Sequence, residues 1–342
     1  MKKIQHLLCV ALAFVFVFSL AVCGADAATG SKFKIMASTR NMVNQYWVEW
    51  NEGGLEASEA LGVEYNLVSA EDDEQKQIAD IETGIANGID ALVVMPVNNA
   101  LLTSIADMCE YNKVPFVAMW DIDESQNPDD YEYWIAQVTQ DASMQGYNEA
   151  IELFKAMGGK GNIVALEGIP GLQTSNDRRK GLEKAMSENP DIKLLGADTG
   201  MFNRTKSLAV MESFISNYGS QINGVWTAND DMSIGAIEAI KSAGLKDVKV
   251  GGIDATVEVV KAIIDGDAVV TLGGDAKGMH GLGIMTAFDA LNGEWPSKGD
   301  KMIFWKPPVV TPANAAQYYK DNFTDAYPGH PWQEMSKTYN KQ

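Results

Sequence analysis

Histidine and cysteine, on which most nucleophilic and metal-dependent catalysis relies, are scarce in this chain. Its 342 residues include only three of each, in none of the spacings that zinc ligands adopt. The motifs G-x-S-x-G, H-E-x-x-H and G-x-x-x-x-G-K-[ST] are all missing. We therefore predict that the protein is not an enzyme and uses neither a metal nor another cofactor. A catalytic carboxylate pair formed by Asp121 and Asp254 is the alternative that stays open.

Positive charge is also in short supply. The chain has 27 Lys and Arg against 46 Asp and Glu, which gives a formal net charge of −19. A strongly acidic surface is repelled by phosphate backbones. The composition therefore predicts that the protein has no nucleic-acid partner, and the acidity itself is interpreted as favouring solubility.

Long hydrophobic runs are absent beyond the first two dozen residues. A basic start precedes an apolar run at 7–22, and Ala25-Asp26-Ala27 follows as a small-x-small triplet. This layout is typical of a secretory signal peptide, and the run is shorter than the ~20 residues that span a bilayer. We predict export with cleavage after Ala27. Lipidation at Cys23 stays open, and Cys109, in an apolar helical pattern, is predicted to be a buried thiol.

The rest of the chain alternates short apolar runs with amphipathic helical stretches such as 73–87, 140–157 and 175–187. Near-continuous apolar strands of this kind predict an α/β fold in which helices cover both faces of parallel sheets. Ten strands exceed one ordinary doubly wound sheet, so we predict two doubly wound lobes of about five strands each. The predicted strands are 33–37, 63–68, 91–95, 115–119, 134–138, 162–166, 193–197, 224–227, 248–253 and 268–272.

Polar residues follow two of these strands at the point where each strand ends. Asn229 comes after the strand at 224–227, and Asp254 comes after the strand at 248–253. The carboxyl ends of parallel strands face the crevice in which ligands bind. The pattern therefore predicts a site that hydrogen-bonds a polar small molecule. The alternative is that both side chains only cap the helices that follow.

Several stretches carry a resemblance to a known family. They are M-A-S-T-R-N-M-V-N-Q-Y-W (36–47), G-I-D-A-L-V-V-M-P-V-N-N-A (88–100), K-V-P-F-V-A-M-W-D (113–121), E-G-I-P-G-L-Q-T-S-N-D-R-R-K-G-L (167–182), G-V-W-T-A-N-D-D-M-S-I-G-A-I-E-A-I (224–240) and G-G-I-D-A-T (251–256). In this order the chain resembles type I periplasmic binding proteins of the ribose-binding type, the substrate receptors of bacterial ABC importers. The resemblance covers nearly all of the chain after the signal peptide.

The resemblance implies a protein of the periplasm whose two lobes close on a monosaccharide or polyol and deliver it to a permease in the inner membrane. We expect a monomer. The chain of such proteins crosses between the lobes three times. This places the first lobe at 32–139 plus 275–304 and the second at 140–274 plus 305–335.

The resemblance also implies which residues contact the ligand. Asp, Asn and Arg pair with sugar hydroxyls, and aromatic rings cover the C–H faces. The matching positions are Asn44, Tyr46, Trp47, Trp120, Asp121, Asn176, Arg178, Phe202, Arg204, Asn229, Asp254 and Asp275. At the fourth strand the acid could instead be Asp123. We expect Trp50 and Trp226 to be core residues, and only one of Arg178 and Arg179 to point inward.

Departures from the ribose-type pattern concern specificity. Asn176, Ile253 and Gly274 stand where that pattern has Arg, Phe and Gln, so a different monosaccharide or a polyol is expected rather than ribose. Two alternatives stay open: a ligand-sensing receptor for a chemoreceptor or sensor kinase, and a binder of a non-sugar molecule, such as a cation held by aromatic rings. A repressor of the lactose-repressor kind would have a helix-turn-helix where this chain has its export signal.

Overall fold

The structure is a computed structural model that describes residues 33–120, 126–273, 275–306, 308–324 and 327–341. The predicted signal peptide, with Ala27 and Cys23, lies outside these residues, and so do Asp121 and Asp123. Residues 31–342 form one unit of their own. Within the described ranges, no helix is long and apolar enough to cross a membrane.

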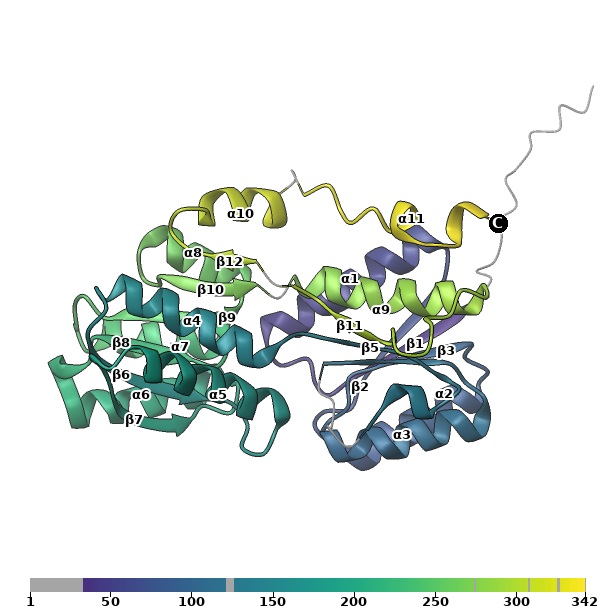
Figure 1. Cartoon of the computed structure of the whole chain (residues 1–342), viewed down its shortest axis with the longest axis horizontal. Coiled ribbons are helices and arrows are strands. Elements are labelled where there is room, and N and C mark those ends of the chain that lie inside the picture. Colours follow the sequence, from purple (N-terminus) through teal and green to yellow (C-terminus); the bar gives the residue numbers. More distant parts are fainter. Residues whose placement is uncertain (1–32, 121–125, 274, 307, 325–326, 342) are drawn as a thin grey trace, which may run out of the picture. The chain divides into compact units, whose positions relative to one another are not determined.

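The first lobe is built on a six-stranded parallel sheet with the order β11-β5-β4-β3-β1-β2. Its strands are β1 (Lys34–Thr39), β2 (Glu64–Ser69), β3 (Ala91–Val94), β4 (Phe116–Met119), β5 (Trp134–Thr139) and β11 (Met302–Phe304). Helices α1 (Gln45–Leu61) and α9 (Ala276–Leu291) cover one face, and α2 (Glu74–Ala86) and α3 (Asn99–Asn112) cover the other (Figure 1).

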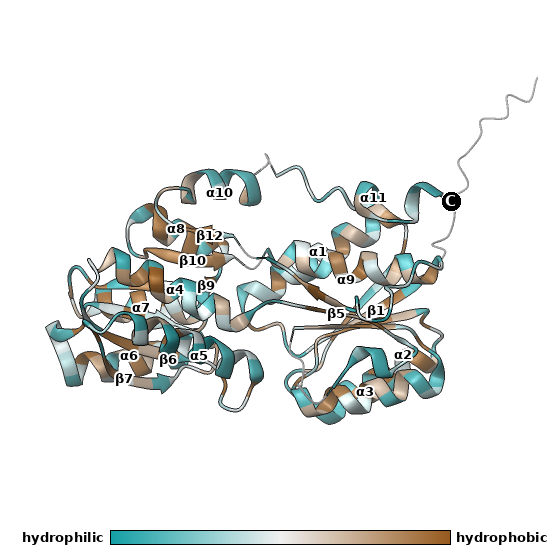
Figure 2. Cartoon of the chain, viewed as in Figure 1, coloured by the Kyte–Doolittle hydropathy of each residue, from teal (hydrophilic) through white to brown (hydrophobic). Residues whose placement is uncertain are grey.

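Successive side chains of β1 belong to two different hydrophobic cores, one on each face of the sheet. Ile35 and Ala37 belong to the core under α1 and α9, whereas Met36 belongs to the core under α2 and α3. Successive residues of a strand point to opposite faces, so a strand covered on both sides has to be apolar throughout. This is why the buried strands are continuous hydrophobic runs, as the hydropathy colouring of Figure 2 shows.

The second lobe repeats the plan with the order β12-β10-β9-β8-β6-β7. Its strands are β6 (Gly161–Glu167), β7 (Ile192–Thr199), β8 (Gly224–Thr227), β9 (Lys249–Asp254), β10 (Val270–Gly273) and β12 (Val309–Val310), of which only β12 is antiparallel to its neighbour. Its helices are α4 (Ala142–Ala156), α5 (Gln173–Glu188), α6 (Arg204–Tyr218), α7 (Asp230–Ser242), α8 (Val257–Asp265) and α10 (Ala315–Phe323). The predicted fold class, two parallel-sheet α/β lobes, is confirmed.

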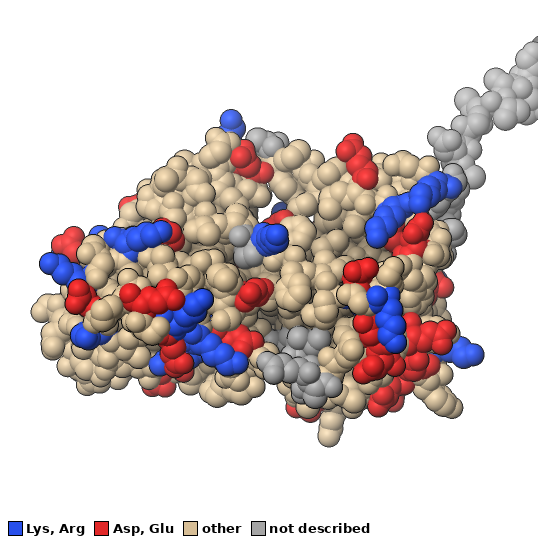
Figure 3. Space-filling view, viewed as in Figure 1, with Lys and Arg blue, Asp and Glu red and all other residues tan. Residues whose placement is uncertain are grey.

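Short elements complete the described chain. Three single turns of 3₁₀ helix occur at Pro128–Asp130, Gly219–Gln221 and Tyr339–Lys341, and α11 spans Trp332–Met335. Trp332 packs in the core of the first lobe, against α1 and α9. On the face shown in Figure 3, basic side chains lie among acidic ones.

Three predictions about buried residues are confirmed. Trp50 and Trp226 are core residues without exposed surface, and so is Cys109, which is a free thiol. Trp50 stacks on His280, with ring centroids 3.3 Å apart. Burial lowers the pKa of His280 to about 3 despite its hydrogen bond with the Trp50 carbonyl, so this histidine is a neutral core residue.

Candidate functional site

A cavity of about 390 Å³ is lined by residues of both lobes. The first lobe contributes Arg40, Asn41, Val43, Asn44, Tyr46, Trp47, Asp72, Met95, Val97 and Trp120. The second lobe contributes Ile169, Leu172, Thr174, Arg178, Met201, Phe202, Asn203, Lys206, Asn229 and Asp254. The volume falls in the range of small-molecule sites, which is roughly 300–1,000 Å³.

Most of the predicted contact residues lie on the wall of this cavity. Those brought together there are Asn44, Tyr46, Trp47, Trp120, Arg178, Phe202, Asn229 and Asp254. Three others lie elsewhere: Asn176 is exposed on α5, Arg204 forms ion pairs with Asp231 and Glu258, and Asp275 caps α9. Asp121 is outside the described residues.

An aromatic wall stands on the first-lobe side. Tyr46 packs edge-on against Trp47 and Trp120, with ring centroids 5.0 and 5.6 Å apart. The first turn of α1 positions two of these rings, because the side chain of Asn44 caps the helix by accepting a hydrogen bond from the Trp47 amide (3.3 Å). Trp120 follows β4 with a φ of 67°, which places its ring beside Tyr46. These rings offer flat apolar surface to a ligand.

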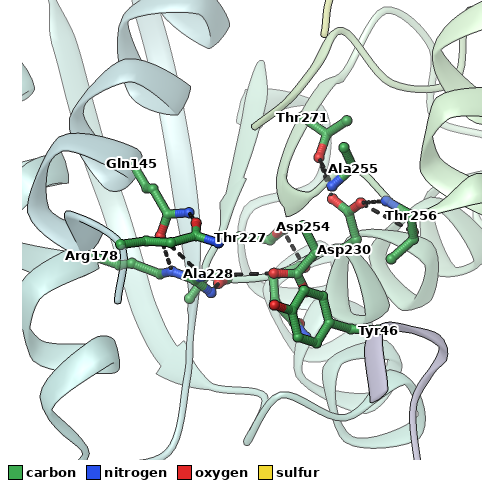
Figure 4. A network of polar contacts seen from close by, with 12 residues as sticks. Tyr46, Gln145, Arg178, Thr227, Ala228, Asp230, Asp254, Ala255, Thr256 and Thr271 are labelled. Atoms are coloured by element: carbon green, nitrogen blue, oxygen red, sulfur yellow. Dashed lines mark hydrogen bonds and ion pairs between the residues drawn. The ribbon is translucent and has the colours of Figure 1, made fainter. Parts of the chain in front are cut away.

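A buried ion pair lies among the second-lobe residues of the cavity. Arg178, on α5, is 3% exposed, and its Nη2 lies 3.7 Å from Oδ1 of Asp254 at the end of β9 (Figure 4). The guanidinium also donates to the Gln145 side chain (3.2 and 3.3 Å) and to the Ala228 carbonyl. It is therefore held in place by groups that are not part of the cavity wall. As expected, only Arg178 points inward, whereas Arg179 pairs with Glu167 and Glu183.

Aromatic rings from both lobes flank the Arg178 guanidinium. Its carbon lies 5.7 Å from the Trp120 ring centroid and 6.0 Å from that of Phe202. Both distances are within the range of cation–π attraction. The Trp120 contact joins the two lobes directly at the cavity.

Burial has the largest effect on the pKa values of the titratable groups Asp254 and Tyr46 in the cavity. Burial raises the pKa of Asp254 well above its ordinary value, Arg178 opposes this rise, and the carboxylate of Asp230 adds to it. Burial also raises the pKa of Tyr46, and the nearby charge of Asp254 acts in the same direction. Hydrogen-bond donors of a ligand that replace the lost water would stabilise the Asp254 carboxylate.

Asp230 supports the site from behind the cavity wall. Its carboxylate accepts hydrogen bonds from the Thr271 hydroxyl (2.7 Å), the Thr256 amide (2.7 Å) and the Thr256 hydroxyl (3.1 Å). It thereby ties α7 to β10 and to the residue that precedes α8, next to Asp254 (Figure 4). Burial raises the pKa of Asp230 to about 6, although these hydrogen bonds act against the rise.

Asn229 and Asp254, the two predicted strand-end residues, differ in whether they cap the helix that follows. The Asn229 side chain lines the cavity and also caps α7, accepting from the Met232 amide at 3.1 Å, so the capping role is observed and contact with a ligand stays a prediction. Asp254 does not cap α8, whose N-cap residue is Thr256. Its φ of 133° is a conformation that L residues rarely adopt. Such strain is typical of functional sites and costs roughly 1–3 kcal/mol.

Several polar residues of the cavity were missed by the sequence analysis. Arg40 and Asn41 follow directly after β1; Arg40 donates to the Pro96 carbonyl (3.2 Å), and Asn41 donates to the Asp72 carboxylate (2.8 Å). They obey the same strand-end rule that pointed to Asn229 and Asp254, so that rule, applied to β1, could have found them. Asn203 and Lys206, at the start of α6, had no comparable signal.

Metal ligation finds no support among the residues that the structure describes. Nowhere in these ranges do three His, Cys, Asp or Glu side chains gather in a way that could hold an ion.

Comparison with known proteins identifies the family. Residues 35–294 match the family described as periplasmic binding protein domain. The chain belongs to this family. This periplasmic binding protein is 32% identical over 253 residues to the xylitol-binding protein of Mycolicibacterium smegmatis (74% of this chain, 71% of that protein). The expected family membership is confirmed.

Two further relatives add to the comparison. The galactofuranose-binding protein YtfQ of Escherichia coli is 34% identical over 217 residues, which cover 62% of this chain and 67% of that protein. A solved ABC transporter periplasmic solute binding protein from Actinobacillus succinogenes, with bound D-allose, superimposes with a TM-score of 0.78 at 26% identity (84% of this chain, 100% of that chain).

Proposed function

We propose that this periplasmic binding protein captures a monosaccharide or polyol between its two lobes, as the substrate-binding protein of an ABC importer. One observation carries the proposal: the aromatic wall of Tyr46, Trp47 and Trp120 shares a cavity with the buried pair of Arg178 and Asp254. A sugar or polyol is a flat or extended molecule with apolar C–H groups and a polar rim of hydroxyls. The cavity offers partners for both.

The arrangement of Arg178 and Asp254 favours a neutral ligand over a cationic one. A ligand cation would have to compete with Arg178, which already lies between the rings of Trp120 and Phe202, and it would be repelled by the fixed guanidinium. A polyhydroxy ligand adds no charge. Its hydroxyls can donate to Asp254 and accept from Arg178 at the same time.

Binding between lobes provides a mechanism for delivery. A ligand that contacts both lobes favours the closed arrangement over the open one by the energy of those contacts. A permease could then recognise the loaded protein by its shape. We propose the lobe limits expected from the sequence, 32–139 plus 275–304 for the first lobe and 140–274 plus 305–335 for the second, with one change. Residues 327–341 are assigned to the first lobe, because Trp332 packs there. Location in the periplasm, cleavage after Ala27 and a monomeric state are part of the same proposal.

A ligand screen tests the proposal. Thermal unfolding would be followed with ribose, D-allose, galactose, xylitol and myo-inositol, and with amino acids and quaternary amines as the contrasting set. A ligand present at 100 times its Kd stabilises the native state by about 2.7 kcal/mol. We expect this stabilisation from at least one polyhydroxy compound. Stabilisation by an amine or amino acid alone would refute the carbohydrate assignment.

Asp254→Asn tests the site itself. The amide keeps the shape of the side chain but removes the charge that faces Arg178, and a hydrogen bond to a charged group is worth about 1.5–3 kcal/mol. We expect the Kd for the compound found in the screen to rise by roughly 10- to 100-fold. The matched control is Asp198→Asn, at the exposed end of β7 in the same sheet. Equal affinities of the two variants in isothermal titration calorimetry would remove Asp254 from the site.

Transport and sensing differ in the partner. If the protein serves import, the loaded protein should stimulate ATP hydrolysis by its permease complex, and the ligand-free protein should do so less. Stimulation of a sensor kinase without any effect on a permease would favour the sensory role.

A further inference from the structure

The C-terminal part of the chain, from β12 to residue 341, packs first on the second lobe and then on the first lobe. β12 pairs with β10, and α10 packs on α8, where the Lys261 ammonium lies 5.3 Å from the Tyr319 ring centroid. These elements belong to the second lobe. The following residues, 327–341, lie on α1 and α9 of the first lobe (Figure 1). The chain crosses between the lobes three times before this point, between β5 and α4, between β10 and α9, and between β11 and β12. The step from α10 to residues 327–341 is therefore a fourth crossing.

A cluster around Glu56 of α1 holds the beginning of this segment. The Glu56 carboxylate accepts hydrogen bonds from the His330 amide (2.6 Å), the Trp332 indole (3.1 Å) and the Tyr327 hydroxyl (3.2 Å). On its other side, the His330 ring reaches Asp275 at the start of α9, with Nε2 and Oδ2 3.0 Å apart. Asp275, expected to contact the ligand, is thus engaged with the C-terminal segment.

Two further contacts hold the rest of the segment. The Trp332 ring is 1% exposed and packs on Gly281 so closely that a Cβ there would come within 2.1 Å of it. Farther on, the Asp289 carboxylate accepts hydrogen bonds from the hydroxyls of Ser336 (2.6 Å) and Thr338 (2.7 Å). The segment is therefore attached to the first lobe by a specific set of partners.

We propose that residues 327–341 act as a clasp that limits how far the two lobes can separate. The chain is anchored on the second lobe through α10 and on the first lobe through this segment, and only residues 324–326 lie between the two anchors. The four residue steps from Phe323 to Tyr327 reach no more than roughly 14 Å even when extended. A wide rotation of the lobes therefore requires the clasp to detach. The proposal rests on the proposed function only in that the lobes move, and it does not depend on which ligand binds.

The groups around His330 make the clasp sensitive to alkaline pH. The ring faces Asp275, Glu56, Tyr327 and Trp332, and the Lys277 ammonium lies 5.3 Å from the Tyr327 ring centroid. Burial alone would lower the pKa of His330, but the hydrogen bonds to Asp275 and Glu56 outweigh it and raise this pKa to about 9. Since the folded pKa is raised, the attachment is strongest below about pH 6.5, the ordinary pKa, and weakens as the pH rises through 9.

Two variants of the full chain would detach the clasp by different means. His330→Gln removes the charge. Gly281→Ala adds a methyl group against Trp332 without any change of charge, at a helix position where Ala is otherwise favoured over Gly. The matched control is Lys337→Gln, which removes a positive charge at an exposed position of the same segment.

Hydrogen exchange of residues 327–341 measures detachment, and electron–electron double resonance between spin labels at Tyr111→Cys (α3) and Ser187→Cys (α5) measures lobe separation, both without ligand. At pH 7 we expect both variants, unlike the control, to exchange roughly tenfold faster in this segment and to extend the distance distribution to longer values. In wild type, the distance distribution should extend to longer values at pH 10, above the raised pKa of His330. Faster exchange with an unchanged distance distribution would overturn the clasp, and unchanged exchange in both variants would overturn the assigned attachment.

Discussion

Glu49 on α1 is a buried carboxyl group outside the ligand cavity. It is 7% exposed, and one oxygen accepts a hydrogen bond from the Gln45 side chain at 3.2 Å. Burial raises the pKa of Glu49 from 4.5 to about 7, although this hydrogen bond, one from the Val257 amide and the charge of Lys277 all act against the rise. The folded protein therefore keeps a proton here at a pH at which the unfolded chain has lost it.

The sign of the effect on stability follows from linkage. A carboxyl group with a raised folded pKa lowers stability as the pH rises from about 4.5 through 7, because ionisation inside the protein is costly. The difference between the two pKa values corresponds to at most about 3 kcal/mol. Glu49→Gln replaces the group with a neutral one of the same shape. We expect little change in the free energy of unfolding at pH 5 and a gain of about 1–3 kcal/mol at pH 8.

Urea unfolding at pH 5 and pH 8 measures this difference. Glu59→Gln is the matched control, because Glu59 lies exposed on the same helix and the substitution changes the net charge equally. The quantity of interest is the gain at pH 8 minus the gain at pH 5, corrected for the control. A corrected difference near zero, or a loss of stability at pH 8, would refute the assignment of an ionisation cost to Glu49.

Two further predictions concern the packing of the second lobe and the free thiol. Gly146→Ala should destabilise the protein by roughly 1–3 kcal/mol and weaken ligand binding, because the new Cβ would lie 2.0 Å from the Arg178 carbonyl oxygen. Urea unfolding would measure the stability and calorimetry the affinity, and an unchanged urea midpoint would contradict the contact. Cys109 is buried, and burial raises the pKa of its thiol to about 12. Its reaction with a disulfide reagent at pH 8 should therefore be at least about 100-fold slower in native than in urea-unfolded protein. Comparable rates would contradict the burial of Cys109.

Much of the fold could be predicted because the local patterns were consistent. The predicted strand at 224–227 coincides with β8, and the other nine predicted strands each overlap one observed strand. β11 and β12 were not in the predicted series because strands of three and two residues have no periodicity to detect. The same limit applies to α11, a single helical turn.

The amino-acid sequence by itself determined the alternation of strands and helices, the two lobes and the polar strand ends, because each depends on residues close together in the chain. Only the tertiary structure decided which charged residues meet. Arg178 reaches Asp254, whereas Arg204 pairs with Asp231 and Glu258, and Asp275 meets His330. In each pair the partners are at least 27 residues apart in sequence. No local pattern encodes such a pairing, since it depends on how helices and strands pack in three dimensions.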